Sequence, residues 1–317
     1  MGISTWVAGG MLAAMVLAHP LGSTLSAAEN RHGVAVIIGN KTYSDQIPAV
    51  EFAHNDADAM KAYVTDVLGY RPGNIIDLRN ATKAQLEATF GNDKSYKGQL
   101  FNWVRAGISD VVVFYSGHGV PGLKDRRGYL LPSDGRANLA ELTGYPLDTL
   151  LGNLEKISAK SMTVIMDACF SGNTPKGFVA KEFSGISVKP RTTKRRSITL
   201  PTAARGDQVA SWDTRAKHGL FTSHLLAALR GKADGKDYGN GDGKVTLGEV
   251  KNYLDDEMTY QARRRYNRDQ NPTIEGPPNR VLATYTPGKT GGAGLKRPSA
   301  SVSVTPPVSL SVRPEKS

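Results

Sequence analysis

A histidine and a cysteine each follow a short apolar segment of this sequence. His118 lies between two glycines in "VVVFYSGHGV" (residues 111–120), and Cys169 directly follows "MTVIMDA" (162–168). An imidazole that takes the proton of a neighbouring thiol makes the sulfur a nucleophile, and it can later protonate a leaving amine. The two residue types therefore predict nucleophilic catalysis, provided that the fold brings them together.

Four apolar, β-branched segments alternate with helical patterns, and this order predicts the fold. Their near-continuous hydrophobicity is typical of strands covered on both faces. The predicted strands are 33–39, 74–78, 110–116 and 162–168. The predicted helices are 55–68, 83–90, 96–106, 147–157, 219–231 and one that begins near 246. We expect a single α/β domain with a mainly parallel central sheet and helices on both sides.

The same alternation predicts where a site would form. Carboxyl ends of parallel strands meet at one edge of a sheet, and sites form in the loops beyond them. His118 follows one predicted strand and Cys169 follows the next. We therefore expect these two side chains to share that edge.

Two capping boxes support the helix starts. Thr82 is followed three residues later by Gln85, and Thr246 by Glu249. In such a pair the hydroxyl and the longer side chain each accept a main-chain N–H of the first turn. Helices are therefore expected to begin directly after Thr82 and Thr246.

The motifs "YSGHG" and "DACFSG", whose His118 and Cys169 are 51 residues apart, resemble the caspase-like cysteine peptidases (peptidase C14), most closely the metacaspase branch. The resemblance extends from about Arg31 to Val281 and includes "VAVIIGNKTY", "AHNDADAM", "GYLLPSDG" and "HGLFTSHLLAAL". It implies a caspase-like α/β/α sandwich. It also implies that Cys169 is the nucleophile and His118 the general base, with the main-chain N–H groups of Cys169 and Gly119 as oxyanion donors.

Less specific interpretations apply to each residue alone. A single buried cysteine is usually a small hydrophobic residue, and a lone histidine is usually a hydrogen-bonded core residue. A zinc site is poorly supported, because one Cys and one His lack partners at ligand spacing. No cofactor is expected to be required. The alternative function is a caspase-like module that binds or scaffolds without turnover.

The resemblance also implies a substrate pocket that takes a basic side chain. Its S1 residues would be Asp56, Ser116 and Asp167, with Asp213 of the "SWD" run as a fourth candidate. Carboxylates in a partly buried pocket favour Arg or Lys and repel Asp. Asp56 could instead cap a helix, and Asp167 could accept a local main-chain bond.

The predicted activity is hydrolysis of peptide or protein substrates after Arg or Lys, through a thioester acyl-enzyme. A long basic loop, 172–197, follows the nucleophile, where caspases are processed. It contains Lys194, Arg195 and Arg196, which are candidate self-cleavage sites. The alternative is a flexible, solvated loop that is not cut.

A glycine-rich segment, "DYGNGDGKVTLGEV" (237–250), resembles half of an EF-hand. Asn240, Asp242 and Glu249 would be calcium ligands, but the first loop position is Tyr238 and the ligand set is incomplete. We favour a glycine-rich turn that leads into the helix cap. Calcium activation occurs among metacaspases, but the acidic cluster used there cannot be placed in this sequence.

The first 28 residues contain no Asp, Glu, Lys or Arg and resemble a secretory signal peptide. An apolar run (7–18) precedes a small-x-small pattern at Ser26-Ala27-Ala28. This predicts a secreted or periplasmic protein whose peptidase domain spans 29–285. An uncleaved N-terminal membrane anchor is the alternative. The single cysteine excludes an internal disulfide.

The net charge of +11 is concentrated in two segments. The run 189–196 contributes +5, and a Pro- and Ser-rich basic tail, 286–317, contributes +4 and is expected to be disordered. No aromatic residues interleave with these charges, so specific nucleic-acid binding is not expected. A polyanion or envelope-surface binder acting through the loop and tail is a third hypothesis.

Overall fold

The computed structural model describes residues 29–44, 47–171, 173–174, 177–179, 198–203 and 208–285. The predicted signal peptide, most of the basic loop with Lys194, Arg195 and Arg196, and the tail lie outside the described residues. No helix in these described ranges has the length and apolar character needed to cross a bilayer.

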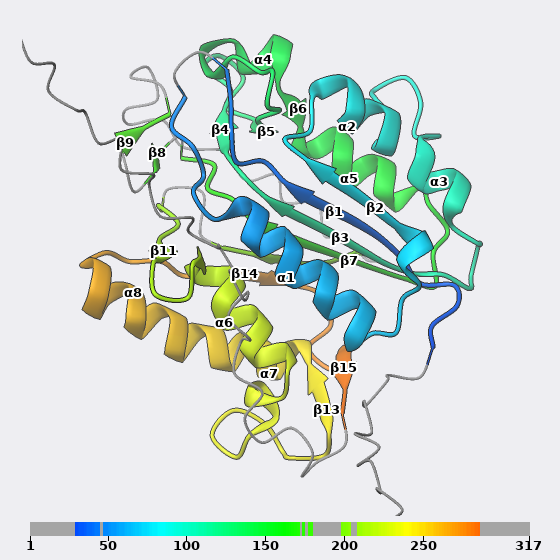
Figure 1. The fold of residues 1–317 in the computed structure, drawn as a ribbon, viewed down its shortest axis with the longest axis vertical. Helices are drawn as coiled ribbons and strands as arrows, with labels where there is room; N and C mark the ends of the chain where they lie inside the picture. Colours follow the sequence, from blue (N-terminus) through cyan, green and yellow to red (C-terminus); the bar gives the residue numbers. More distant parts are fainter. Residues whose placement is uncertain are drawn as a thin grey trace, which may run out of the picture.

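A six-stranded sheet forms the centre of the fold, in the order β14-β10-β7-β3-β1-β2 (Figure 1). Its strands are β1 (Val34–Gly39), β2 (Ile75–Arg79), β3 (Asp110–Ser116), β7 (Ser161–Asp167), β10 (Ile198–Thr202) and β14 (Thr273–Glu275). All neighbouring strands are parallel except β14, which pairs antiparallel with β10 at the edge. The predicted mainly parallel sheet is confirmed.

Helices cover both faces of the sheet (Figure 1). On one face lie α1 (Ala53–Asp66), α6 (Leu220–Leu229), α7 (Leu247–Tyr253) and α8 (Thr259–Tyr266). On the other lie α2 (Lys83–Phe90), α3 (Gln99–Trp103) and α5 (Leu147–Glu155). Helix α3 is shorter than predicted, because its flanking residues Gly98 and Val104 are both extended.

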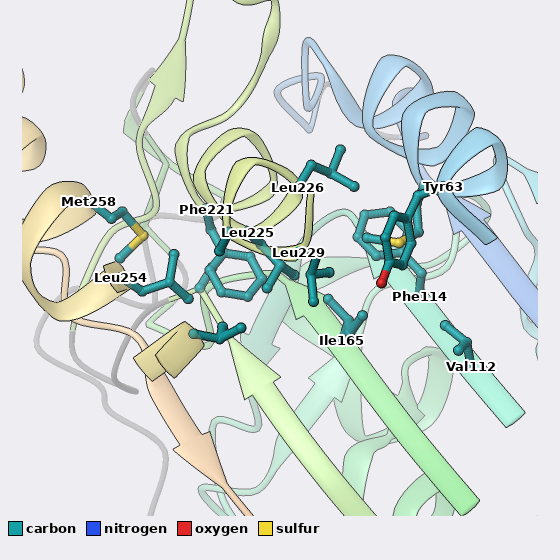
Figure 2. Close-up of a cluster of buried hydrophobic side chains, with 14 of the residues drawn as sticks. Tyr63, Val112, Phe114, Ile165, Phe221, Leu225, Leu226, Leu229, Leu254 and Met258 are labelled. Carbon is teal, nitrogen blue, oxygen red and sulfur yellow. The ribbon is translucent and has the colours of Figure 1, made fainter. Parts of the chain in front are cut away.

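Successive side chains of the central strands pack alternately into two separate hydrophobic cores, one on each face of the sheet. In β1, Ala35 and Ile37 join the core beneath α1 and α6, whereas Val36 and Ile38 join the core beneath α2 and α5. This is the period of two that a strand imposes. Figure 2 shows the first core, where residues of α6 pack over Ile165. Burial on both faces explains why the strand sequences lack polar alternation.

Smaller elements surround the ends of the sheet. The strands are β4 (Gly119–Pro121), β5 (Gly128–Leu130), β6 (Tyr145–Pro146), β8 (Asn173–Thr174), β9 (Gly177–Phe178), β11 (Trp212–Asp213), β12 (His218–Gly219), β13 (Lys244–Thr246) and β15 (Val281–Thr284). The helical turns are η1 (Pro72–Asn74), η2 (Ala137–Leu139), α4 (Ala140–Thr143), η4 (Lys232–Asp234) and η5 (Leu254–Met258).

Both predicted capping boxes are present. Thr82 caps α2 with Gln85, and Thr246 caps α7 with Glu249, whose Oε2 accepts the Thr246 N–H at 2.8 Å. The glycine-rich turn before α7 is held by Asp234, which accepts main-chain N–H groups of residues 241–243. Glu249 therefore acts as a helix cap. Within the described part of the chain, no cluster of three His, Cys, Asp or Glu is arranged to hold a metal ion.

Asn40 ties together the carboxyl ends of the strands. Its main-chain N–H donates to the Ser116 carbonyl at 2.8 Å, and its amide nitrogen donates to the carbonyls of Ala81 and Leu131 at 3.3 Å. Its amide oxygen accepts the Ala81 N–H at 2.7 Å. Because Asn40 is fully buried, these bonds are shielded from water and fix the sheet edge from which the site projects.

Candidate active site

A cavity lies at the carboxyl ends of β3 and β7. The register of these strands places Ser116 beside Asp167, so the residues that follow each strand leave the sheet side by side. His118 and Cys169 both line this cavity, together with Asp56, Ser116 and Asp167. The structure thus brings five of the predicted site residues to one place.

His118 is held by two main-chain contacts. Its Nε2 lies 2.6 Å from the carbonyl oxygen of Pro48, and its main-chain N–H donates to the Tyr43 hydroxyl at 2.8 Å. Because a carbonyl can only accept, Nε2 carries the proton, and Nδ1 of the neutral ring is the free base. Burial lowers the pKa of His118 to about 4, against the opposing effect of the Pro48 bond. The imidazole is therefore neutral at pH 7.

Cys169 is 9% exposed, and its Sγ accepts a hydrogen bond from the main-chain N–H of Ala210. Burial raises the pKa of its thiol to about 12, although the Ala210 bond lowers it. Both side chains are therefore uncharged near pH 7. Gly119 lies close by, since a Cβ there would meet the Cys169 carbonyl oxygen at 2.7 Å. The oxyanion roles of Gly119 and Cys169 stay predictions.

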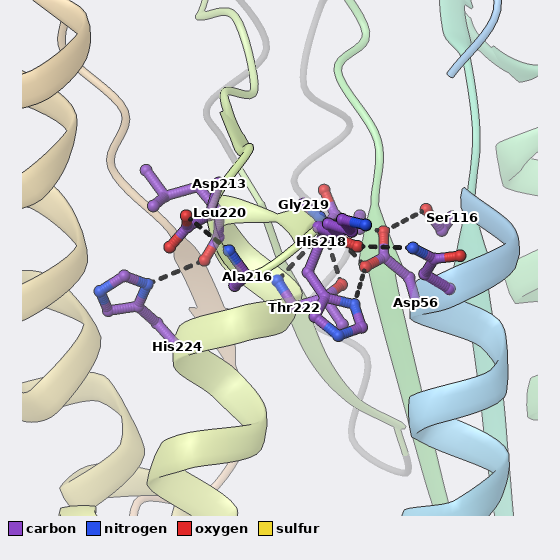
Figure 3. A network of polar contacts seen from close by, with 12 residues as sticks. Asp56, Ser116, Asp213, Ala216, His218, Gly219, Leu220, Thr222 and His224 are labelled. Atoms are coloured by element: carbon purple, nitrogen blue, oxygen red, sulfur yellow. Dashed lines mark hydrogen bonds and ion pairs between the residues drawn. The ribbon is translucent and has the colours of Figure 1, made fainter. Parts of the chain in front are cut away.

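Asp56 is a buried carboxylate that three donors satisfy (Figure 3). Its Oδ2 accepts the Ser116 hydroxyl at 3.0 Å, and its Oδ1 lies 2.9 Å from His218 Nδ1 and 3.0 Å from the Gly219 main-chain nitrogen. Burial raises the pKa of Asp56, and the bond from His218 opposes that rise. Asp56 does not cap α1, because its partners lie on β3 and β12.

Asp167 has one carboxylate oxygen that bonds to Thr222 and one that accepts no hydrogen bond from the described residues. Its Oδ2 accepts the Thr222 hydroxyl at 2.6 Å and the Thr222 main-chain N–H at 3.1 Å. No described residue donates a hydrogen bond to its Oδ1. Burial, followed by repulsion from Asp56, raises the pKa of Asp167 to about 7. The cavity therefore contains a carboxylate that can accept a donor from outside the protein.

Asp213 is not among the residues that line this cavity, and its place in S1 stays a prediction. Its Oδ1 accepts the main-chain N–H groups of Arg215 and Ala216 at 3.1 Å, and its Oδ2 accepts from Gln261 at 3.3 Å. The carboxylate therefore holds the turn between β11 and β12. Its neighbour Trp212 lines the cavity instead.

Sequence reasoning missed several residues of the site. Pro48 and Ala210 contribute a main-chain carbonyl and a main-chain N–H, which leave no signature in residue type. His218 and Thr222 lie in the segment "HGLFTSHLLAAL", which the resemblance includes. Nothing in that segment's spacing tells which of its polar side chains would reach the two aspartates.

Residues 32–282 match the family model of the caspase domain, peptidase C14. The chain belongs to this family. Caspase-1 from Spodoptera frugiperda shares the fold, with a TM-score of 0.52 at 15% identity over 80% of this chain and 90% of that chain. No curated protein matches the sequence. The predicted caspase-like sandwich is confirmed, and the closer likeness to metacaspases stays a prediction.

The raised pKa of the Cys169 thiol predicts that it is alkylated slowly. With a pKa of about 12, only about one molecule in 10⁵ carries a thiolate at pH 7. We expect iodoacetamide to label Cys169 about a hundredfold or more slowly than an unstructured cysteine peptide, with a rate that still rises above pH 9. The Cys169→Ala variant controls for labelling elsewhere. A rate plateau between about pH 5 and 8 would indicate a thiolate–imidazolium pair and contradict this prediction.

Proposed function

We propose that this protein is a cysteine endopeptidase that hydrolyses peptide bonds after Arg or Lys. One observation carries the proposal: the cavity that contains His118 and Cys169 also contains two buried carboxylates. A nucleophile and a base supply the reaction, and the carboxylates supply a reason to select a cationic side chain.

In the proposed reaction, Sγ turns from the Ala210 N–H toward His118 as the substrate enters. Nδ1 of His118 takes the thiol proton while sulfur attacks the scissile carbonyl carbon, and the main-chain N–H groups of Gly119 and Cys169 donate to the resulting oxyanion. The C–N bond then breaks, and Nδ1 delivers the proton to the leaving amine. A thioester remains on Cys169.

Water completes the cycle. His118 takes a proton from water as its oxygen attacks the thioester carbon, the C–S bond breaks, and the proton returns to sulfur. The Pro48 carbonyl, 2.6 Å from Nε2, keeps the ring in the tautomer whose Nδ1 is basic. It also stabilises the imidazolium that forms in both steps.

Recognition of the P1 side chain would rest on Asp167. Its open Oδ1 can accept a guanidinium or ammonium N–H, while Thr222 fixes the other oxygen. Asp56 adds a second negative charge, held in place by Ser116 and His218. A P1 aspartate would meet two carboxylates, and no Arg or Lys stands among the described residues that line the cavity, which disfavours it strongly.

A fluorogenic peptide panel with P1 Arg, Lys and Asp, read with and without calcium, tests the proposal. We expect turnover of the Arg and Lys peptides only, and none by Cys169→Ala. Asp167→Asn should lower kcat/KM for the Arg peptide by about a hundredfold, the loss expected when a charged hydrogen bond is removed. Asp213→Asn is the matched control and should keep the preference for Arg over Asp. Cleavage after Asp, or an unchanged preference in Asp167→Asn, would contradict the assignment.

The pKa of Asp167 predicts that the preference for a basic P1 residue depends on pH. Because that pKa is raised to about 7, the carboxyl becomes neutral as the pH falls below 7 and no longer attracts a cation. We expect the ratio of kcat/KM for P1 Arg to that for the uncharged isostere citrulline to fall by up to about tenfold per pH unit below 7. Because both substrates depend equally on His118 and Cys169, the titration of these two residues does not change the ratio. In Asp167→Asn the ratio should not depend on pH. A ratio in the wild type that does not change with pH would contradict the prediction.

The same specificity suggests self-cleavage within 189–196. Lys194, Arg195 and Arg196 offer basic P1 residues, and they lie outside the described residues. We expect mass spectrometry of the purified protein to find termini after these residues, absent from Cys169→Ala. Equal fragmentation of both proteins would assign the cuts to another protease.

A caspase-like binding module without turnover is the second candidate. One observation favours it: Sγ accepts a hydrogen bond from the Ala210 N–H, and burial raises the pKa of the thiol to about 12. Protection of Cys169 from alkylation by a leupeptin-like basic inhibitor separates the two functions. An enzyme should be protected by the inhibitor, whereas a module that has lost the substrate site should not.

A further inference from the structure

A second cavity, of about 540 Å³, lies at the opposite end of the sheet from Cys169. It is built from the residues that precede three adjacent parallel strands: the turn before β1, η1 before β2, and the connection from α3 to β3. The residues relevant here are Arg31, His32, Arg71, Asn74, Trp103 and Arg105. The site proposed for peptide hydrolysis uses none of them.

The lining of this cavity is strongly cationic. Three arginines line the cavity, and one carboxylate, that of Glu29, pairs with two of them. It accepts a hydrogen bond from Arg71 and lies 3.8 Å from Arg31. No carboxylate of the described residues pairs with the guanidinium of Arg105. The nearby Asp110 is already bound by Asn30, Lys160 and Ser161. An excess of positive charge therefore faces the cavity.

The main chain that carries these groups is fixed. The Asn74 side chain donates to the carbonyls of Arg31 and Gly33 at 3.0 and 3.1 Å, which joins the turn before β1 to η1. The Arg105 main-chain N–H donates to the Ser109 hydroxyl at 3.0 Å, and the Ser109 N–H returns to the Arg105 carbonyl. The arginines therefore project from a preformed frame.

Trp103 adds an aromatic surface to the same cavity. Its side chain is 38% exposed, which is unusual for an indole. Exposed aromatic rings next to arginines are surfaces on which planar rings stack, each worth about 1–3 kcal/mol. The cavity therefore offers two kinds of contact, one to negative charge and one to a flat ring.

We propose that this cavity binds a small organic phosphate that carries a planar aromatic ring, the chemistry of a nucleotide. Guanidinium groups bind phosphate oxygens through paired, charge-assisted hydrogen bonds. The volume lies within the range of about 300–1,000 Å³ typical of small-molecule sites. The site is independent of peptide hydrolysis, so it stands whether or not the protein is a protease.

Calorimetric titration of the full chain with ADP tests the proposal, in the Cys169→Ala background to prevent self-cleavage. We expect saturable binding at one site. Arg105→Gln should weaken it by about tenfold or more, as loss of a charged hydrogen bond predicts. Arg265→Gln, which removes an exposed charge on α8, is the matched control and should leave the affinity unchanged. Trp103→Leu should weaken binding of ADP and spare that of inorganic pyrophosphate.

The substitution Glu29→Gln should change the affinity for ADP in the opposite direction. Removing this carboxylate frees Arg31 and Arg71 for the ligand, so the variant should bind ADP severalfold more tightly than the parent. Gain of affinity cannot come from misfolding. Absence of ADP binding, equal weakening by Arg105→Gln and Arg265→Gln, or equally tight binding of a hexaglutamate peptide would overturn the proposal.

Discussion

Burial of the Asp56 carboxylate constrains the whole site. A carboxylate 1% exposed is strongly unfavourable unless donors replace the lost water. Asp56 comes from α1, and its donors come from β3 and from the β12 hairpin, about 60 and 160 residues further along the chain. These segments must therefore meet for the fold to be stable. The packing of α1 and β12 against β3 also fixes the strand ends that His118 and Cys169 follow.

In the proposed reaction, the residues that recognise the substrate and the residues that react lie at the ends of the same two strands, β3 and β7. Ser116 and Asp167 are the last residues of β3 and β7, and His118 and Cys169 follow each of them by two positions. The parallel register places Ser116 opposite Asp167, and both line one cavity with His118 and Cys169. A P1 side chain seated against Asp167 would leave its own carbonyl near the thiol. In the proposed reaction, this geometry would link the choice of side chain to the bond that is cut.

The two cavities carry opposite charge, and they lie at opposite ends of the same parallel strands. The carboxyl ends of the parallel strands, with helix α1 beside them, line the acidic cavity, and the segments before the strands line the arginine-rich cavity. Nine of the eleven net positive charges lie in the basic run and the tail, so the net charge says little about either cavity. Opposite ends of one sheet can therefore attract ligands of opposite sign.

The sequence by itself determined four of the six strands of the central sheet, the starts of α2 and α7, and the position of His118 and Cys169 at one edge of the sheet. Strand runs and capping boxes are local patterns that depend on neighbours within a few residues, and parallel strands bring their carboxyl ends together without further information. The tertiary structure alone decided that Pro48 contacts His118 and that Ala210 contacts Cys169, since main-chain groups look alike in every residue. It also decided that Asp213 holds a turn while His218 faces Asp56. These outcomes depend on which way each loop approaches the cavity, and only packing against distant segments fixes that direction.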